Sequence, residues 1–323
     1  MSPSFAQLDA GGRLRHLLTL DGLPRGLIES LLGRAADFAA SRGRATAHGK
    51  ALEGSTVVNL FAEPSTRTRA SFEIAALRLG GDVLNFDSAL SSRAKGETLL
   101  DTVHTLLAMQ VDVFVIRDAE AGVQERVARE VDGQAAVVSA GEAHLSHPTQ
   151  GLLDAMTIRE HKGDVGRLRV AIVGDIARSR VARSAHQALS TLGAREIRIV
   201  APPGMMPADA EFPGARRFDA LDDGIAGADV VMMLRIQHER AGGAGPVDLA
   251  TYHREFGLTS KRLSRAAPQA IVMHPGPMNR GVEIDSDVAD GPHSVIRRQV
   301  ANGVAVRMAV LEHLAAARRP HAG

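Results

Sequence analysis

The feature of this sequence that most constrains its fold is an alternation of short β-rich runs with amphipathic stretches, which occurs twice. The runs of the first series are TVVNLF (56 to 61), DVLNF (82 to 86), VDVFVIR (111 to 117) and AAVVSAG (135 to 141). Those of the second series are RLRVAIVGD (167 to 175), EIRIVAP (196 to 202), DVVMMLR (229 to 235) and QAIVMHPG (269 to 276). Strands that alternate with helices form parallel sheets with right-handed crossovers. The sequence therefore predicts an α/β fold of two domains, each a parallel β-sheet flanked by helices.

Helical patterns lie between the strands and at the junction of the two series. In the first series they cover residues 70–79, 97–108 and 122–131. The segment HPTQGLLDAMTIREHKG (147 to 163) predicts a helix that joins the two domains and stops at Gly163. The segment SVIRRQVANGVAVRMAVLEHL predicts a last helix that packs back on the first domain. Its apolar stripe is Val300, Val304, Met308 and Leu311.

These elements predict the extent of each domain. We expect a first domain of residues 1–150 plus 295–323 and a second domain of residues 151–294. Two domains suit the length of the chain, because single cores seldom grow beyond about 250 to 300 residues. Residues 238–259 begin with several glycines and predict a mobile loop in the second domain.

Composition excludes several classes of function. The net charge of +1 and the aromatic content of 3% disfavour a nucleic-acid binder. The chain has no cysteine, which excludes disulfides, thiolate catalysis and cysteine zinc sites. The N-terminus lacks the apolar core of a signal peptide, and no apolar run approaches the roughly 18 residues of a membrane span. We therefore expect a soluble, cytoplasmic protein that does not bind membranes.

Within the segment EPSTRTRASFE (63 to 73), the five residues 65–69 place three hydroxyls and two arginines where a predicted strand passes into a helix. Backbone N–H groups and the helix dipole favour an anion at such a junction. Hydroxyls add donors, and Arg67 can clamp two phosphate oxygens. The alternative is an ordinary helix cap at Ser65 or Thr66 beside solvated arginines. The G-x-x-x-x-G-K pattern of a P-loop is absent from the sequence.

Further polar residues follow the other predicted strands. They are Lys95, Arg117, His147, Arg178, Arg180, Arg183, Arg235, Gln237 and the turn MHPGPMNRG (273 to 281), which can present backbone carbonyls. Taken singly, each could be structural or solvated. His144 and His147 lack a third metal ligand nearby, and VGDIARSR (173 to 180) lacks the glycine pattern of a dinucleotide site. Because ligands bind at the carboxyl ends of parallel strands, the set predicts a site for small anions that catalyses by positioning and charge neutralisation.

Six motifs, in order along the chain, resemble those of the aspartate/ornithine carbamoyltransferase family, and within it the catalytic chains specific for aspartate. They are STRTR, SSRAKGET, HPTQ, VGDIARSR, LRIQHER and HPGPMNRG, and the likeness runs from about residue 14 to residue 314. The resemblance implies transfer of the carbamoyl group from carbamoyl phosphate to L-aspartate (EC 2.1.3.2), the first committed step of pyrimidine synthesis. It implies a carbamoyl-phosphate domain, an aspartate domain, closure between them, and no cofactor or metal.

The resemblance also implies a role for each matching residue. Phosphate would be bound by Ser65, Thr66, Arg67 and Thr68. The carbamoyl carbonyl would be polarised by Thr68, Arg117 and neutral His147, and the carbamoyl nitrogen held by Gln150 and the backbone of Pro275 and Gly276. The carboxylates of aspartate would be bound by Lys95, Arg180, Arg235 and Gln237. The residues expected to act in catalysis are Arg67, Thr68, Lys95, Arg117, His147 and Gln150, whereas Arg69 could be structural.

Ser91 and Lys95 would come from a neighbouring subunit, which implies a homotrimer with shared active sites. Gly276 stands where some members have leucine, and this favours the branch whose trimers assemble with dihydroorotase or a dihydroorotase-like chain. Binding of a regulatory chain is a less favoured alternative. Two other functions stay open. The first is an ornithine or other carbamoyltransferase, although the ornithine enzymes carry a cysteine that this chain lacks. The second is a non-catalytic scaffold paralogue.

Overall fold

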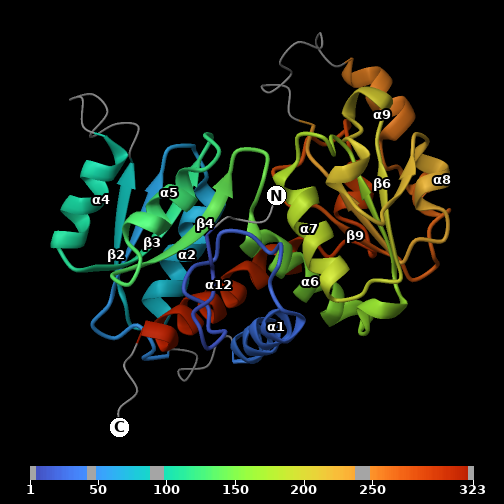
Figure 1. Cartoon of the computed structure of the whole chain (residues 1–323). Helices are drawn as coiled ribbons and strands as arrows, with labels where there is room; N and C mark the ends of the chain where they lie inside the picture. Colours follow the sequence, from blue (N-terminus) through green and yellow to red (C-terminus); the bar gives the residue numbers. More distant parts are fainter. Residues whose placement is uncertain (1–4, 42–48, 88–97, 237–247, 319–323) are drawn as a thin grey trace. The chain divides into compact units, whose positions relative to one another are not determined.

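The computed structural model describes residues 5–41, 49–87, 98–236 and 248–318, which form an α/β fold with two parallel sheets. The chain divides into two compact units (Figure 1). The first unit comprises Met1–Leu152 and Asn302–Gly323, and the second comprises Leu153–Ala301. Helices α6 (Pro148–Lys162) and α12 (Ile296–Arg318) each contribute residues to both units.

The first unit is built on a four-stranded parallel sheet with the strand order β2-β1-β3-β4. Apart from α6 and α12, the helices and strands of this unit have the following bounds: α1 Arg25–Ala40, β1 Thr56–Phe61, α2 Thr66–Arg78, β2 Asp82–Asp87, α4 Leu99–Ala108, β3 Val111–Asp118, α5 Val123–Glu130 and β4 Ala136–Glu142. All four predicted strands are confirmed within a residue or so. Strand β3 is buried at nearly every position, which is why it appears in the sequence as a continuous apolar run and not as an alternating one. Its Phe114 and Ile116 pack with Val127 of α5 in the core.

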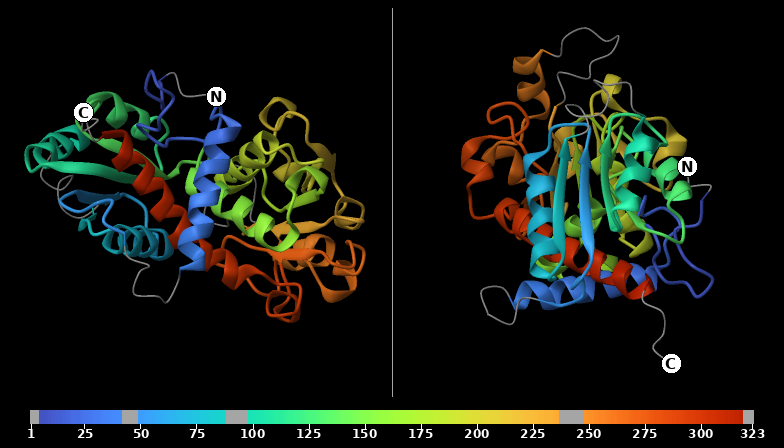
Figure 2. Two further views of the ribbon diagram at one scale, coloured as in Figure 1. Left: turned by 90° about the horizontal axis from the view of Figure 1, so that it is seen from below. Right: turned by 90° about the vertical axis from the view of Figure 1, so that its left-hand side faces the viewer.

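Helix α1 follows Pro24 and was not predicted from the sequence. It buries one apolar stripe at helical spacing, which comprises Ile28, Leu31, Leu32, Ala35 and Phe38. The left view of Figure 2 shows α1, in blue, crossing α12, in red. At this crossing Arg34 Nε and Nη2 donate to the two carboxylate oxygens of Glu312, at 2.5 and 2.9 Å. Helix α12 therefore packs on the first unit as expected, and its partner there is α1, a helix that was not predicted.

Helix α12 differs from expectation in two ways. Val300, predicted to be on its apolar stripe, is 50% exposed, whereas Met308 and Leu311 are buried. In addition, α12 is long and apolar enough to pass as a membrane span, with a mean hydropathy of 1.2, although no such segment was expected. However, 61% of that window is buried inside the protein, so the apolar composition is explained by packing.

The second unit is built on a five-stranded parallel sheet with the order β7-β6-β5-β8-β9. Its other elements are β5 Arg169–Val173, α7 Arg180–Thr191, β6 Glu196–Val200, β7 Arg216–Phe218, α8 Leu221–Ile225, β8 Val230–Met233, α9 Leu249–Phe256, α10 Ser260–Leu263, β9 Ile271–Met273, α11 Ser286–Ala289 and three short 3-10 turns at Val165–Arg167, Pro203–Met205 and Asp209–Glu211. The four predicted strands are confirmed in shorter form. The three-residue edge strand β7 was missed.

Helix α9 corrects the prediction of a loop over residues 238–259. The Asp248 carboxylate accepts from the backbone N–H groups of Ala250 and Thr251, which caps the start of the helix. Tyr252 and Phe256 are buried with their ring centroids 5.6 Å apart. The glycine-rich start of the predicted loop, up to residue 247, lies outside the described residues.

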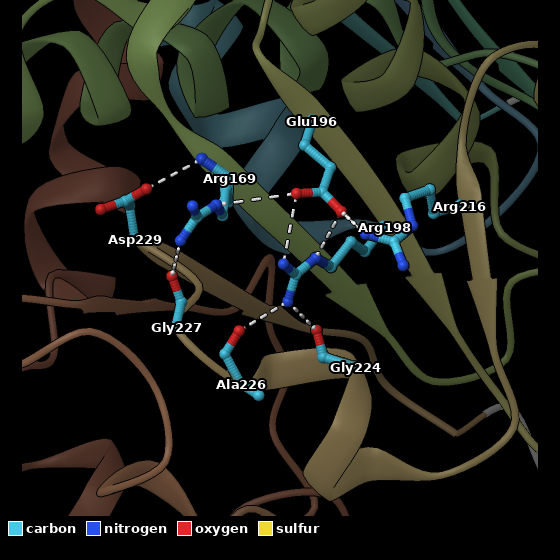
Figure 3. A network of polar contacts seen from close by, with 8 residues as sticks. All are labelled: Arg169, Glu196, Arg198, Arg216, Gly224, Ala226, Gly227 and Asp229. Carbon is cyan, nitrogen blue, oxygen red and sulfur yellow. Dashed lines mark hydrogen bonds and ion pairs between the residues drawn. The ribbon is translucent and has the colours of Figure 1, made fainter.

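The amino edge of the second sheet carries a network of arginines around one carboxylate (Figure 3). Glu196 accepts from Arg198 at 3.1 and 3.2 Å and from Arg216 at 2.7 Å, and Arg169 lies 3.7 Å away. The hydrogen bond from Arg198 is the main reason that the pKa of Glu196 lies below its usual value. Arg198 also donates to the carbonyls of Gly224 and Ala226. This network closes the end of the sheet opposite to the candidate site.

Candidate functional site

In the first unit, the predicted anion-binding segment forms the start of a helix. Strand β1 ends at Phe61, and α2 begins at Thr66 with Ser65 at the N-cap. The helix begins four residues earlier than predicted, so Thr66, Arg67 and Thr68 lie in its first turn. The N–H groups of a first turn have no acceptor within the helix. The Ser65 hydroxyl accepts no capping hydrogen bond, so the part of the alternative that made Ser65 an ordinary cap is wrong, whereas Arg67 is exposed as that alternative expected.

The neighbouring strand β3 brings Arg117 to the same edge of the sheet. Arg117 is paired in register with Phe61 of β1. Its Nη1 donates to the Ala140 carbonyl at 3.2 Å, and its Nε lies 3.3 Å from Oε2 of Glu63. Glu63 was not singled out in the sequence, although it stands directly before the STRTR motif. The structure thus gives Arg117 two neighbours that fix the plane of its guanidinium.

After strand β4, His147 and Gln150 lie at the start of α6. Both side chains are buried, and the Gln150 N–H donates to the His147 carbonyl at 2.9 Å. Since β4 is the neighbour of β3, these residues belong to the same sheet edge as Arg117 and the first turn of α2. Glu142, at the end of β4, accepts from the Gly122 N–H at 2.6 Å, and burial raises its pKa. The edge therefore offers arginine, histidine, hydroxyl and amide groups that suit a phosphate and a polar carbonyl.

In the second unit, the candidate residues follow the neighbouring strands β5, β8 and β9. Arg180 is the first residue of α7 and is buried, and the Ser179 hydroxyl before it accepts from the Ala182 N–H. Arg235 follows β8, whose Met233 is in register with Val173 of β5. One guanidinium group thus follows β8 closely, and the other begins the helix after the adjacent strand β5. Pro275 and Gly276 follow β9, on the other side of β8.

The other two arginines of the VGDIARSR region have structural partners. Arg178 Nη1 lies 3.2 Å from both carboxylate oxygens of the buried Asp175. Burial raises the pKa of Asp175, and the neighbouring Arg178 opposes that shift. Arg183 pairs with Glu211 and donates to the Ala177 carbonyl at 3.0 Å. These contacts give Arg178 and Arg183 a structural role on either side of Arg180.

Three predicted residues lie outside the described part of the chain. They are Ser91, Lys95 and Gln237. Within the described residues, no group of three or more histidine, aspartate or glutamate side chains could hold a metal ion. His144 is exposed and His147 is buried, so the pair that the sequence suggested does not share an environment.

Comparison with known sequences and structures defines the class of protein to which this fold and these residues belong. Residues 15–160 match the aspartate/ornithine carbamoyltransferase carbamoyl-P binding domain, and residues 167–314 match the aspartate/ornithine carbamoyltransferase Asp/Orn binding domain. The chain belongs to the aspartate/ornithine carbamoyltransferase family. It is therefore related to enzymes that transfer a carbamoyl group.

Solved structures of both branches are similar to the chain. Aspartate transcarbamoylase from Trypanosoma cruzi, in complex with carbamoyl aspartate and phosphate, has a TM-score of 0.85 and 29% identity, over 95% of this chain and 98% of that one. The same enzyme with carbamoyl phosphate and aspartate has a TM-score of 0.83 and 30% identity, over 95% and 98%. Ornithine carbamoyltransferase from Pyrococcus furiosus has a TM-score of 0.82 and 30% identity, over 92% and 96%. Similarity alone thus favours neither acceptor.

Proposed function

We propose that this protein is an aspartate carbamoyltransferase that makes N-carbamoyl-L-aspartate and phosphate for pyrimidine synthesis. The observation that carries this proposal is the placement of Arg180 at the start of α7, the helix that follows β5, and of Arg235 just after the adjacent strand β8. Two guanidinium groups match the two carboxylates of aspartate, and arginine binds carboxylates through paired hydrogen bonds. The ammonium of the ornithine side chain would be repelled by the same groups. The nearby Asp175 does not offset them, because Arg178 neutralises it.

The residues of the first unit bind and activate carbamoyl phosphate in this proposal. The first turn of α2, with Ser65, Thr66, Arg67 and Thr68, holds the phosphate. Arg117 and His147 donate hydrogen bonds to the carbamoyl oxygen, where negative charge develops during attack. A neutral histidine that donates one N–H suits this role. Gln150 binds the carbamoyl nitrogen, together with the carbonyls of Pro275 and Gly276.

The chemical step needs no nucleophile from the protein. The amine of aspartate attacks the carbamoyl carbon, a C–N bond forms, and the bond from that carbon to the phosphate oxygen breaks. The electron pair leaves with the phosphate, which also accepts the proton of the amine. Positioning and charge neutralisation then supply most of the rate enhancement.

The family resemblance also motivates a proposal for assembly. We infer a homotrimer in which Ser91 and Lys95 act in the site of a neighbouring subunit, with Lys95 and Gln237 adding to the aspartate contacts. Trimers of this kind could assemble further with a dihydroorotase or dihydroorotase-like chain. The cysteine-free sequence is compatible with a reducing cytoplasm, where we place the enzyme.

Inhibition by molecules that mimic one acceptor tests the aspartate assignment. Succinate has both carboxylates of aspartate but no amine, and norvaline has the carbon chain of ornithine without its terminal ammonium. We expect succinate to compete with the acceptor and norvaline to have no effect at equal concentration. Competition by norvaline alone would favour the ornithine enzyme, which is the second candidate because the P. furiosus ornithine carbamoyltransferase is as similar as the aspartate enzymes.

A further inference from the structure

Beneath the HPGP turn of the second unit lies a buried pair of ionisable side chains, His274 and Glu283. Both side chains are 0% exposed, and His274 Nε2 is 3.1 Å from Oε1 of Glu283. The Gly276 N–H donates to Nδ1 of His274 at 2.8 Å. Since Nδ1 accepts this hydrogen bond, the ring proton is on Nε2 and is donated to the Glu283 carboxylate. The two contacts fix the orientation of the imidazole at both nitrogens.

The hydrogen bond from Gly276 also fixes a carbonyl. In a trans peptide the N–H and the C=O groups point in opposite directions. The peptide between Pro275 and Gly276 is trans, and its N–H points inward to the His274 ring. The Pro275 carbonyl must therefore point away from the buried pair. This is one of the two carbonyls assigned to the carbamoyl nitrogen.

Glu283 reaches a second part of the proposed site through Asn279. Its Oε1 accepts from the Asn279 N–H at 2.6 Å, and the Asn279 side chain donates to the Ile236 carbonyl at 3.4 Å. Ile236 follows Arg235, one of the two arginines assigned to aspartate. A single carboxylate oxygen thus connects the turn after β9 with the chain that follows β8.

The backbone of His274 is anchored as well. Its N–H donates to Oε1 of Gln299 at 3.0 Å, and Gln299 Nε2 donates to Oδ1 of Asp154 at 2.7 Å. Gln299 and Asp154 are buried residues of α12 and α6. His274 is consequently held on both sides, and movement of its ring is transmitted to Gly276 and Glu283.

We propose that His274 and Glu283 are positioning residues for carbamoyl transfer, which aim the Pro275 carbonyl and hold the main chain beside Arg235. This inference rests on the proposed function, because it gives a role to contacts with the carbamoyl nitrogen and with aspartate. A buried charge is costly unless its partners are satisfied, and an apolar pair could fill the same space. The positioning role gives a reason why the chain carries a buried imidazole and a buried carboxyl group here.

Two variants of Glu283 separate positioning from simple stabilisation. Glu283→Gln keeps an oxygen that accepts from both His274 and Asn279, whereas Glu283→Ala removes the acceptor of the buried His274 ring and of the half-buried Asn279 N–H. We expect kcat and both KM values of Glu283→Gln within about threefold of the wild type. For Glu283→Ala we expect kcat to fall at least about tenfold and the KM for aspartate to rise about tenfold, effects typical of misplaced substrate-binding groups.

Arg198→Met is the matched control, because Arg198 is a buried, multiply bonded residue at the opposite edge of the same sheet (Figure 3). It should lower Tm without changing KM. The inference is overturned if Glu283→Ala behaves like this control, or if Glu283→Gln is as impaired as Glu283→Ala.

Amide hydrogen exchange separates failure of this inference from failure of the proposed function. The Gly276 N–H should exchange slowly in the wild type and in Glu283→Gln, and at least about tenfold faster in Glu283→Ala and His274→Phe. His274→Phe removes the acceptor of its hydrogen bond, and Glu283→Ala removes the carboxylate that orients the accepting ring. This readout needs no substrate. If the wild type does not use aspartate, the proposed function fails while the exchange pattern still supports positioning of the turn. If exchange at Gly276 is the same in all four proteins, the positioning role is wrong whatever the acceptor.

Discussion

Arg117 Nε and Glu63 Oε2 lie 3.3 Å apart at the ends of the neighbouring strands β3 and β1. Their side chains are only 13% and 17% exposed, so this ion pair is screened less by water than a surface pair. The Ala140 carbonyl accepts from Nη1 of the same guanidinium. The pair therefore orients Arg117 before substrate arrives, and this orientation is what a carbamoyl oxygen would require.

Replacement of Arg117 by lysine tests whether this orientation of the guanidinium is needed for catalysis. Arg117→Lys keeps the charge but cannot bond Glu63, Ala140 and a substrate oxygen in one plane. We expect kcat to fall about a hundredfold, the usual loss on removal of one donor to a developing oxyanion. Glu63→Gln removes only the orienting charge and should lower kcat by a smaller factor. Steady-state kinetics check both, and wild-type kcat in Arg117→Lys would refute the role of Arg117.

The shape of the loop after β5 should affect aspartate binding. Gly174 has a φ of +136°, and an added Cβ would lie 2.9 Å from Cβ of Leu234, which precedes Arg235. We expect Gly174→Ala to destabilise the protein by about 3 kcal/mol through backbone strain and the clash. It should also raise the KM for aspartate. Gly214→Ala is the control, because it has a φ of +76° with no atom within 4 Å of an added Cβ. An equal effect of both variants on KM would contradict the prediction.

His16 should make the protein sensitive to acid. Burial, with Arg15 and Arg318 nearby, lowers the pKa of His16 from 6.5 to about 4. Above pH 6.5 the ring is neutral in the folded and the unfolded chain, so it has no effect on stability. As pH falls from 6.5 to 4, protons bind preferentially to the unfolded chain. The free energy of unfolding should therefore drop, by about 3 kcal/mol in total.

Urea unfolding at pH 7.5 and pH 4.5 measures this loss. The control is His16→Asn, whose side-chain oxygen can replace Nδ1 as the acceptor of the Val137 N–H. The variant should lose less stability between the two pH values than the wild type. Equal losses would show that His16 is not the acid-sensitive group.

Shared active sites can be tested by mixing inactive chains. Lys95→Ala and His147→Ala should each be inactive alone if Lys95 acts in the site of a neighbour. In randomly mixed trimers about one site in four would combine an intact His147 with an intact neighbouring Lys95. Activity should recover to about that fraction. Full mixing of subunits without recovery would contradict the shared site.

The sequence predicts those features of this protein that follow from local patterns. The strands β1 to β6, β8 and β9 were identifiable because buried parallel strands are short apolar runs between helical segments. The three-residue β7 carries too few residues for such a pattern. Helix α1 was not predicted although its apolar residues have helical spacing, and its start has no side-chain cap that would mark it.

The site was predictable to a similar degree. Arg117 and Arg235 lie at or just after the ends of strands, and His147 and Arg180 lie at the starts of the helices that follow β4 and β5. Parallel strands bring their carboxyl ends to one edge of each sheet. Glu283 has no such signal, because it lies beyond the HPGP turn among other acidic residues that are exposed or half-buried. Only the fold shows that it is buried against His274. The contacts of Arg178 with Asp175 and of Arg183 with Glu211 likewise appear only in the fold.

The most direct test of the account is phosphate release from carbamoyl phosphate by the purified chain, with L-aspartate or L-ornithine as the acceptor. The account predicts release that depends on aspartate and is absent with ornithine. Release that depends on ornithine would contradict the assignment of Arg180 and Arg235 to a dicarboxylate. If neither acceptor supports release, even with a dihydroorotase-like partner chain added, the protein is a transferase for another acceptor or a scaffold, and the account is wrong.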